Sequence, residues 1–245
     1  MSSVTVVDAH GQQLAPCSPE KAQHLLAAGK ARLVTESPPV IQLPLVAALR
    51  PRRDEQPVVR PGAGRTLLLH VCCGPCGTYS IHRLREQGFD VTGFWYNPNI
   101  HPFSEHERRR ECIAAYARDV GLPMLWSEGY EMPVYFRAVA GHEAPAERCA
   151  ICYGLRLGRT AQTAREGGFD ALSTTLLISP HQQQSRIRAL GETLAQQEGL
   201  AFYFENLRRG WNERGRLARE HGLYQQHYCG CIYSEWEAAA RSAAK

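Results

Sequence analysis

From residue 66 onward, short apolar segments alternate along the chain with segments that have the pattern of amphipathic helices. Residues 66–71, Thr-Leu-Leu-Leu-His-Val, form an almost continuous apolar run, as a strand buried on both faces of a parallel sheet requires. Further strands are predicted at 91–96, 124–126, 171–177 and 201–204, and helices at 78–87, 104–120, 134–140, 152–166 and 182–198. This alternation predicts an α/β fold with a doubly wound, mainly parallel, Rossmann-like sheet.

A basic segment rich in proline and glycine precedes this region. Residues 50–65 hold five arginines, three prolines and two glycines with little that could pack, which indicates a linker. We therefore expect a small N-terminal domain at 1–48, a linker at 49–65 and a larger domain at 66–245. In the small domain, three short strand patterns surround a helix that begins at Ser18-Pro19, which predicts an α+β unit.

Cysteine is the residue type whose distribution is most informative about chemistry. Seven of the nine cysteines lie in three tight groups, at 72, 73 and 76, at 149 and 152, and at 229 and 231. Nine cysteines in 245 residues are about 4%, well below the content of a disulfide scaffold. The chain also lacks a signal-peptide pattern and an apolar run of membrane length, so we expect a cytoplasmic protein with no membrane association. Grouped cysteines in that compartment indicate metal ligands or catalytic dithiols.

The predicted topology brings two of these groups to one edge of the sheet. Cys72 and Cys73 directly follow the first strand of the larger domain, and ligand sites in open α/β sheets lie beyond the carboxyl ends of strands. Both can bind one metal only if the chain leaves the strand there, as Gly74-Pro75 permits. Cys149 and Cys152 are predicted at the entry to a helix, where the dipole favours thiolates. The alternatives for these four residues are an iron–sulfur cluster, a four-cysteine zinc site and separately buried thiols.

The N-terminal segment, about residues 3–45, resembles the small PLMP or RRXRR domain found at the N-terminus of some RNA-guided nucleases. The resemblance is carried by residues 13–19, Lys21, 25–26, 29–31 and 41–43. The chain departs from the pattern at Ala15, which replaces a methionine, and at residues 35–37, which replace an arginine run. The resemblance implies nucleic-acid contact by this domain, and the alternative is a small folded appendage.

Five motifs of the larger domain resemble the QueH-type epoxyqueuosine reductases, in unbroken order over about residues 66–236. They lie at residues 68–76, 96–102, 149–152, 174–180 and 228–231. The resemblance implies reduction of epoxyqueuosine, a modified wobble base of tRNA, to queuosine in the last step of queuosine biosynthesis. It also implies a 4Fe-4S cluster on Cys72, Cys73, Cys149 and Cys152, and a redox-active Cys229–Cys231 pair.

The reaction itself sets requirements that can be compared with the residues. Removing an epoxide oxygen as water takes two electrons and two protons, whereas an iron–sulfur cluster carries one electron at a time. Cys229-Gly230-Cys231 could supply a second redox group by cycling between dithiol and disulfide, and the alternative is an inert surface turn. An additional iron is a second candidate cofactor. His101, Glu131 and Tyr228 are candidate proton donors, and histidine is the best matched to neutral pH.

The expected partners are a tRNA that carries epoxyqueuosine and an electron-donor protein or other reductant, which the sequence does not identify. Asn97 and Asn99 could bind a base edge or shape turns. Ser179 precedes a predicted helix whose N-terminus could hold a phosphate. Phosphate contacts could also come from several arginines, at 108–110, 186, 188, 208, 209, 214, 216 and 219.

Two other kinds of protein fit part of the pattern. An ATP-dependent tRNA-modifying enzyme on a similar sheet would need a Ser-Gly-Gly-rich phosphate loop after the first strand, where this chain has Cys-Cys-Gly-Pro-Cys. A zinc-stabilised RNA-binding protein without redox catalysis would be colourless. The sequence does not determine the oligomeric state or the role of Cys76.

Overall fold

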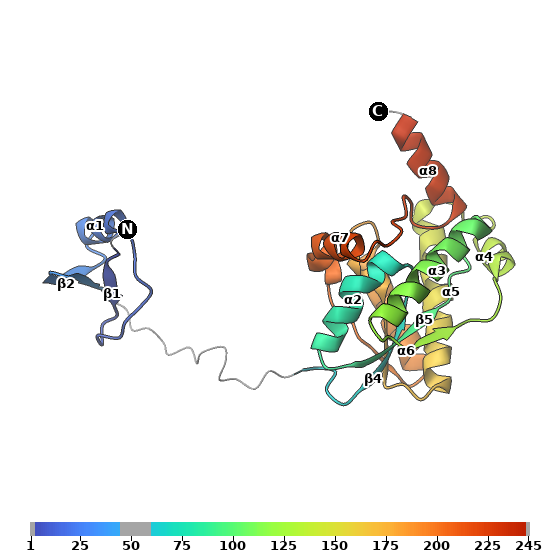
Figure 1. Ribbon diagram of the computed structural model, residues 1–245, viewed down its shortest axis with the longest axis horizontal. Coiled ribbons are helices and arrows are strands. Elements are labelled where there is room, and N and C mark those ends of the chain that lie inside the picture. The colour runs from blue at the N-terminus through green and yellow to red at the C-terminus, as the bar shows by residue number, and fades with distance from the viewer. Residues whose placement is uncertain (1–2, 45–59, 244–245) are drawn as a thin grey trace. The chain divides into compact units, whose positions relative to one another are not determined.

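The computed structural model describes residues 3–44 and 60–243, and the chain divides into two compact units, Met1–Val59 and Arg60–Lys245. Figure 1 shows the elements of each unit. The smaller unit contains β1 (Thr5–Val7), α1 (Pro19–Ala27), β2 (Arg32–Glu36) and β3 (Pro39–Gln42). Its sheet has the order β1-β3-β2, with β1 parallel and β2 antiparallel to β3. This is the predicted α+β architecture.

The smaller unit has a small hydrophobic core and a balanced number of basic and acidic side chains. Val4, Val6, Ala22 and Ile41 are buried together, and the hydroxyl of Ser18 caps α1 by accepting from the backbone N–H of Lys21. Three basic and three acidic side chains occur among residues 3–44, so the described part of this unit carries no excess positive charge for phosphate contact.

The segment predicted as a linker is only partly described. Residues 45–59 lie outside the described residues, whereas residues 60–65 are part of the larger unit. The N–H of Gly62 donates to the carbonyl of Gln87 at 3.0 Å. Gly62 is buried against the ring of Phe89, where an added Cβ would lie 2.3 Å from Cγ. The larger unit therefore begins several residues before the predicted position 66.

The larger unit is built on a five-stranded parallel sheet. Its strands are β4 (Thr66–His70), β5 (Asp90–Trp95), β6 (Met124–Trp126), β7 (Ala171–Thr174) and β8 (Ala201–Phe202), in the order β6-β5-β4-β7-β8. Its helices are α2 (Gly74–Glu86), α3 (Phe103–Asp119), α4 (Met132–Val139), α5 (Pro145–Glu166), α6 (Gln184–Gln197), α7 (Trp211–Glu220) and α8 (Ile232–Ala243). Short 3-10 turns, η1 (Thr175–Ile178) and η2 (Leu207–Gly210), follow β7 and precede α7.

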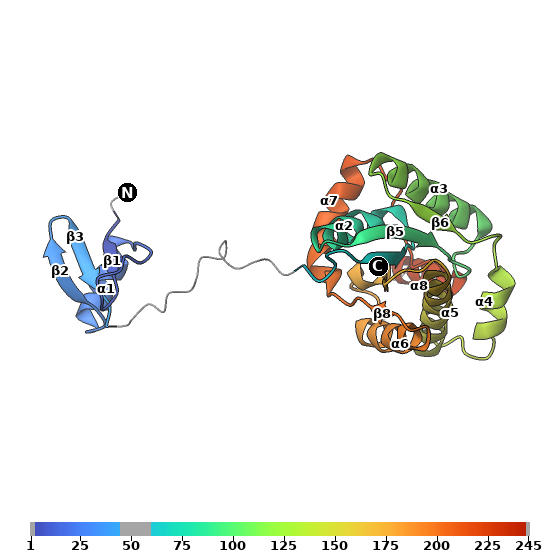
Figure 2. The ribbon, with the colours of Figure 1, turned by 90° about the horizontal axis from the view of Figure 1, so that it is seen from below.

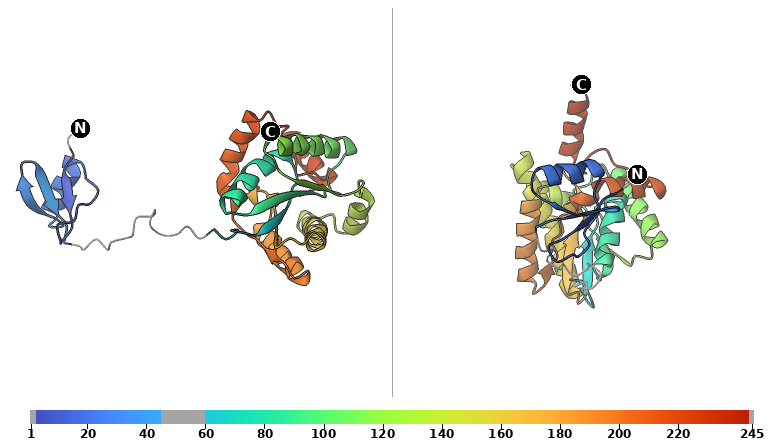
Figure 3. Two further views of the ribbon diagram at one scale, coloured as in Figure 1. Left: turned by 60° about the horizontal axis from the view of Figure 1, so that its bottom comes forward. Right: turned by 90° about the vertical axis from the view of Figure 1, so that its left-hand side faces the viewer.

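Helices cover both faces of this sheet, as Figures 2 and 3 show. Leu67 and Leu69 of β4 pack with residues of α2 and α3, whereas Leu68 between them packs with residues of α5 and α6. Because successive strand residues point to opposite faces, an uninterrupted apolar β4 is what two covered faces require. The predicted doubly wound α/β fold is confirmed.

Two helix starts differ from the prediction in ways that affect the site. α2 begins at Gly74 and not near residue 78, and α5 begins at Pro145 and not at residue 152. Proline in the first turn of each helix explains both starts, because its missing N–H has no intrahelical partner there. Cys149 and Cys152 therefore lie inside α5 and not at its entry. Among the described residues, no helix is long and apolar enough to cross a membrane.

Candidate metal centre

The candidate site lies at the carboxyl ends of three neighbouring strands. The backbone N–H of Cys72, after β4, donates to the hydroxyl of Thr175, after β7, at 3.1 Å. The side-chain amide of Asn97, after β5, donates to the carbonyl of Val71 at 2.9 Å. These bonds join loops that are far apart in the sequence, because parallel strands end at the same edge of the sheet.

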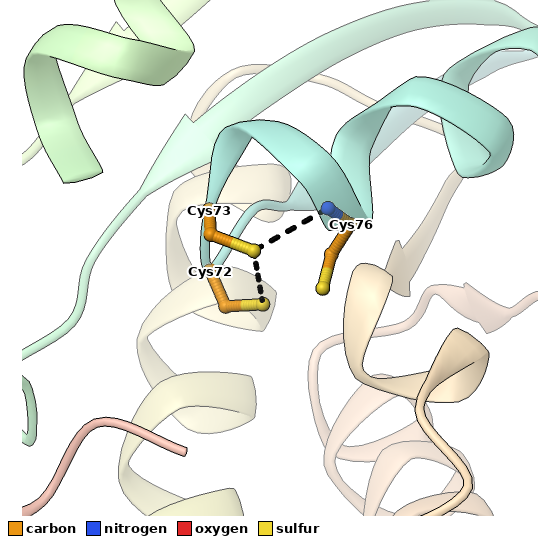
Figure 4. Close-up of side chains that lie close together, drawn as sticks. All are labelled: Cys72, Cys73 and Cys76. Atoms are coloured by element: carbon orange, nitrogen blue, oxygen red, sulfur yellow. Dashed lines mark hydrogen bonds between the residues drawn. The ribbon is translucent and has the colours of Figure 1, made fainter. Parts of the chain in front are cut away.

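Three cysteine sulfurs lie close together between the end of β4 and the first turn of α2. Cys73 is the N-cap of α2, with an extended backbone, and its sulfur accepts from the N–H of Cys76 at 3.3 Å. The sulfurs of Cys72 and Cys73 are 3.9 Å apart, and all three lie within 4.8 Å of one another. Figure 4 shows the three side chains pointing toward one another. The chain leaves the strand after His70, and these three thiols could hold a metal ion.

Hydrogen bonds among these sulfurs give them different acidities. The thiols of Cys73 and Cys76 hold the pKa of Cys72 well below its usual range, and the hydroxyl of Thr175, 3.3 Å from the Cys72 sulfur, acts in the same direction. Burial raises the pKa of Cys73, and the contact with Cys72 raises the pKa of Cys76 to about 12. The amide of Gln226 donates to the sulfur of Cys73 at 3.0 Å. Cys72 is therefore the most acidic of the three thiols.

Cys149 and Cys152 are near this group but not part of it. Cys149 packs in the same apolar cluster as Cys72, Cys73 and Cys76, whereas Cys152 is buried in a neighbouring cluster. Within the described residues, neither sulfur belongs to the group that lies within 4.8 Å. A single tetrahedral zinc ion sets its ligand sulfurs about 3.8 Å apart, so the geometry disfavours one zinc ion held by both pairs. An iron–sulfur cluster spreads its ligands more widely, because each thiolate binds a different iron.

The predicted effect of the helix dipole on Cys149 and Cys152 was wrong. Burial raises the pKa of Cys149 to about 11 and that of Cys152 to about 12. The reason is that α5 starts four residues before Cys149, so its unpaired N–H groups belong to the preceding turn. A proton must leave each of these sulfurs when it binds a metal.

Cys229 and Cys231 occupy a loop that leads into α8. Cys229 is exposed and Cys231 is buried, and both are free thiols. The buried side chain of Arg109 donates to the carbonyl of Cys229 at 2.9 Å and to that of Tyr228 at 3.2 Å. The amide of Gln182 donates to the sulfur of Cys229 at 3.2 Å. These contacts fix the loop beside the other cysteines.

The surroundings of His101 do not suit a proton donor. Its Nδ1 accepts from the N–H of Ile232 at 3.3 Å, and its backbone N–H donates to the carbonyl of Gly230 at 2.8 Å. Burial lowers its pKa to about 4, so the ring is neutral at pH 7. The hydroxyl of Tyr228 donates to the carbonyl of His101, and burial raises the pKa of that tyrosine. His101 therefore supports the cysteine loop, and at neutral pH its ring lacks the acidic proton of an imidazolium.

The residues predicted to contact substrate lie in different settings. Asn97 and Asn99 are buried, and the side-chain oxygen of each has no hydrogen-bond partner among the described groups. Ser179 is half-buried, and its hydroxyl accepts from the N–H of His181 at 3.2 Å. Because α6 begins only at Gln184, Ser179 is not at a helix N-terminus, and the predicted phosphate site there lacks its physical basis.

Burial or internal hydrogen bonds occupy three of the arginines predicted to contact phosphate. Arg109 and Arg214 are buried, and Arg208 donates to the carbonyls of Ser179 and Gln182. Of the arginines predicted to contact phosphate, those that are exposed are 108, 110, 186, 188, 209, 216 and 219.

The residues around the sulfurs fit an anionic metal–thiolate group. Buried polar atoms without a hydrogen-bond partner among the described groups include atoms of Asn97, Asn99, His101, Tyr135, Arg148, Arg156, Arg214 and Gln226. Arg109, Arg148, Arg156 and Arg214 each interact electrostatically with at least one cysteine sulfur. Buried polar groups normally have partners, so this concentration of unpaired atoms indicates a site prepared for a charged group.

The fold and the site define an α/β protein with a cysteine-rich candidate metal centre at the carboxyl edge of a parallel sheet. Residues 67–237 match the family described as "Epoxyqueuosine reductase QueH", and residues 4–59 match the family described as "RRXRR protein". The chain belongs to the QueH family, and both predicted resemblances are confirmed.

Curated relatives match most of the larger unit. The epoxyqueuosine reductase QueH of Dehalococcoides mccartyi is 40% identical over 171 residues, which cover 70% of this chain and 93% of that protein. The epoxyqueuosine reductase QueH of Thermotoga maritima is 38% identical over 185 residues, which cover 73% of this chain and 94% of that protein.

Some site residues were absent from the sequence-based set. Cys76 could have been included from its spacing, because Cys73-Gly-Pro-Cys76 is a C-x-x-C sequence. Arg156 and Gln226 carried no comparable signal, since their contacts with the cysteines depend on the tertiary fold.

Proposed function

We propose that this protein reduces epoxyqueuosine to queuosine at the wobble position of tRNA, with loss of water. The observation that carries the proposal is the gathering of cysteine motifs of a QueH-family chain at the carboxyl edge of the sheet. The reaction consumes two electrons and two protons, and the epoxide oxygen leaves as water.

The proposed cofactor is a 4Fe-4S cluster held by Cys72, Cys73, Cys149 and Cys152. Its wide ligand spacing suits two sulfur pairs that are not within 4.8 Å of each other, and the positive surroundings suit its negative charge. When bound, the cluster supplies one-electron transfer. Cys76 adjoins this ligand set, and the proposal leaves room for an additional iron.

The proposed role of Cys229 and Cys231 is to provide electrons and protons together. Oxidation of two thiols to a disulfide releases two electrons and two protons, which equals the demand of the reaction. Cys229 is exposed and can meet the substrate, whereas Cys231 is buried behind it. A reductant or electron-donor protein then restores the dithiol. This source of protons replaces His101, whose ring is neutral at pH 7.

The test is a turnover assay with the substrate itself. Protein reconstituted with iron and sulfide under anaerobic conditions is reduced, incubated with tRNA that carries epoxyqueuosine, and the nucleosides are analysed by mass spectrometry. We expect the nucleoside to lose the mass of one oxygen. Replacing both Cys72 and Cys73 by Ser should abolish conversion, whereas Cys17→Ser, in the smaller unit, should not. An unchanged nucleoside, with conversion by the Thermotoga maritima relative in parallel, would reject the proposal.

A second candidate rests on the compact three-sulfur group. The 3.9 Å between the sulfurs of Cys72 and Cys73 is close to the spacing around one tetrahedral zinc ion, which would suit a zinc-stabilised RNA-binding protein. Elemental analysis decides between the two. Stoichiometric zinc without iron in a colourless protein supports this candidate, and a brown protein that dithionite bleaches excludes it.

A further inference from the structure

One face of α5 carries a buried arginine beside the proposed cluster ligands. Cys149, Cys152 and Arg156 are separated by three and four residues, a spacing that places them on the same side of a helix. Arg156 is 2% exposed and belongs with the largest fully buried side chains of the protein. Its guanidinium therefore lies in the interior and does not reach solvent.

This guanidinium has almost no conventional partner. Its Nε donates to the carbonyl of Cys152 at 3.3 Å, and one of its terminal nitrogens has no hydrogen-bond partner among the described groups. Two other buried arginines are paired, Arg109 with Glu105 at 2.7 Å and Arg148 with Glu237 at 2.6 Å. No ion pair within residues 3–44 and 60–243 includes Arg156.

The groups that face Arg156 are mainly sulfurs. Burial alone would lower the pKa of the guanidinium. The nearby Cys152, Cys229 and Cys72, and to a smaller extent Tyr153, act in the opposite direction, so the pKa is raised overall. His70 lies close enough for Arg156 to act on it, but a histidine ring is either neutral or positive and offers no negative charge. Among residues 3–44 and 60–243, a negative charge opposite Arg156 can therefore come only from the cysteine site.

Burying a cation without a counter-charge is strongly unfavourable, which makes this arrangement stable only if the sulfurs carry negative charge. We infer that Arg156 is a positioning residue that serves as the internal counter-charge of the bound iron–sulfur group and raises its reduction potential. The inference rests on the proposed function. A fixed positive charge stabilises the reduced state more than the oxidised state, because reduction adds one negative charge to the group.

The experiment uses the full chain loaded with iron and sulfide, in four forms. These are the wild type, Arg156→Gln, Arg156→Lys and, as a matched control, Arg165→Gln, which removes an exposed charge from the same helix. Arg165 is paired with Glu198 at 2.9 Å, on the surface of the unit. For each form we measure iron and sulfide per chain and the midpoint potential in a redox titration followed by electron paramagnetic resonance.

We expect Arg156→Gln to lower the midpoint potential of the cluster. At the wild-type midpoint potential, the ratio of reduced to oxidised cluster should fall at least tenfold, which corresponds to a shift of about 59 mV for one electron. Arg156→Lys, which keeps the charge, and Arg165→Gln should remain near the wild-type value. If Arg156→Gln does not fold, Arg156→Met replaces it as the variant that removes the charge, and its midpoint potential is compared with that of Arg156→Lys. A tenfold lower ratio in the methionine variant with a wild-type potential in the lysine variant supports the inference. A wild-type potential in the methionine variant, or a tenfold change in the lysine variant, overturns it.

The outcomes separate the inference from the function on which it rests. Equal potentials in wild type and Arg156→Gln, with a normal cluster and active turnover, would overturn the role of Arg156 and leave the proposed function intact. A wild-type protein that binds no iron–sulfur cluster would overturn both.

Discussion

Gly230, the residue between Cys229 and Cys231, offers a sharp test of how the cysteine loop is built. Its φ of +149° lies in a region that side-chain-bearing residues rarely adopt. An added Cβ would also lie 3.2 Å from Asn99 Nδ2 and 3.2 Å from Ile100 Cγ1. Gly230→Ala therefore combines backbone strain with crowding from a buried loop.

The two effects can be given magnitudes and separated. A strained backbone conformation costs about 1–3 kcal/mol, and overpacking adds about 1 kcal/mol or more, so Gly230→Ala should cost about 2–4 kcal/mol. The matched control is Gly222→Ala, because Gly222 also has positive φ, +59°, but has no heavy atom within 4 Å of an added Cβ. It should cost only the backbone part, about 1–2 kcal/mol.

Urea unfolding of wild type and both variants measures these costs. A second readout is the rate at which Cys231 reacts with a thiol reagent under native conditions, because distortion of the loop should expose this buried sulfur. The rate should rise in Gly230→Ala and stay at the wild-type level in Gly222→Ala. Equal destabilisation by both variants, with Cys231 equally protected in both, would refute the reasoning.

The amide of Gln226, the ring of His101 and the smaller unit are each open to a direct test. Gln226→Leu removes the donor 3.0 Å from the Cys73 sulfur and should lower the cluster midpoint potential in a redox titration; an unchanged or higher potential contradicts this. The pKa of His101 falls from 6.5 to about 4 on burial, so the unfolded chain binds the extra proton between these pH values. The free energy of unfolding should thus decrease by up to about 3 kcal/mol as pH falls through this window. His101→Gln should remove that part of the pH dependence in urea unfolding, and an identical pH profile would show the assignment to be wrong. Deleting residues 1–44 should leave tRNA affinity within about twofold in filter binding, since the charges there cancel, and a tenfold loss would establish a role in RNA contact.

Much of the larger fold could be predicted because its central strand carries an unambiguous pattern. Leu67, Leu68 and Leu69 are all fully buried, as a strand covered on both faces requires. The same pattern correctly placed Cys72 and Cys73 at the carboxyl edge, because a strand's end determines where the next residues lie.

The site could be predicted less completely, because its details depend on helix starts and on burial. Cys76 was grouped by sequence with Cys72 and Cys73, but its role stayed undetermined, because it depends on Pro75 opening α2. Arg156 resembles any surface arginine of a polar helix in sequence. Its burial is decided by the packing of α5 against the sheet, which no local pattern encodes.

The pairing of β4 with β7 determines when the metal centre can come into existence. Cys72 and its partner Thr175 are 103 residues apart, and Gln226 is 153 residues from Cys73. Parallel strand pairing over such separations forms late in folding, because the entropy of closing a long loop is lost before the stabilising contacts form. Assembly of the proposed iron–sulfur cluster must accordingly follow synthesis and folding of nearly the whole unit. Until then, the vicinal thiols after β4 depend on the reducing capacity of the cell for their protection.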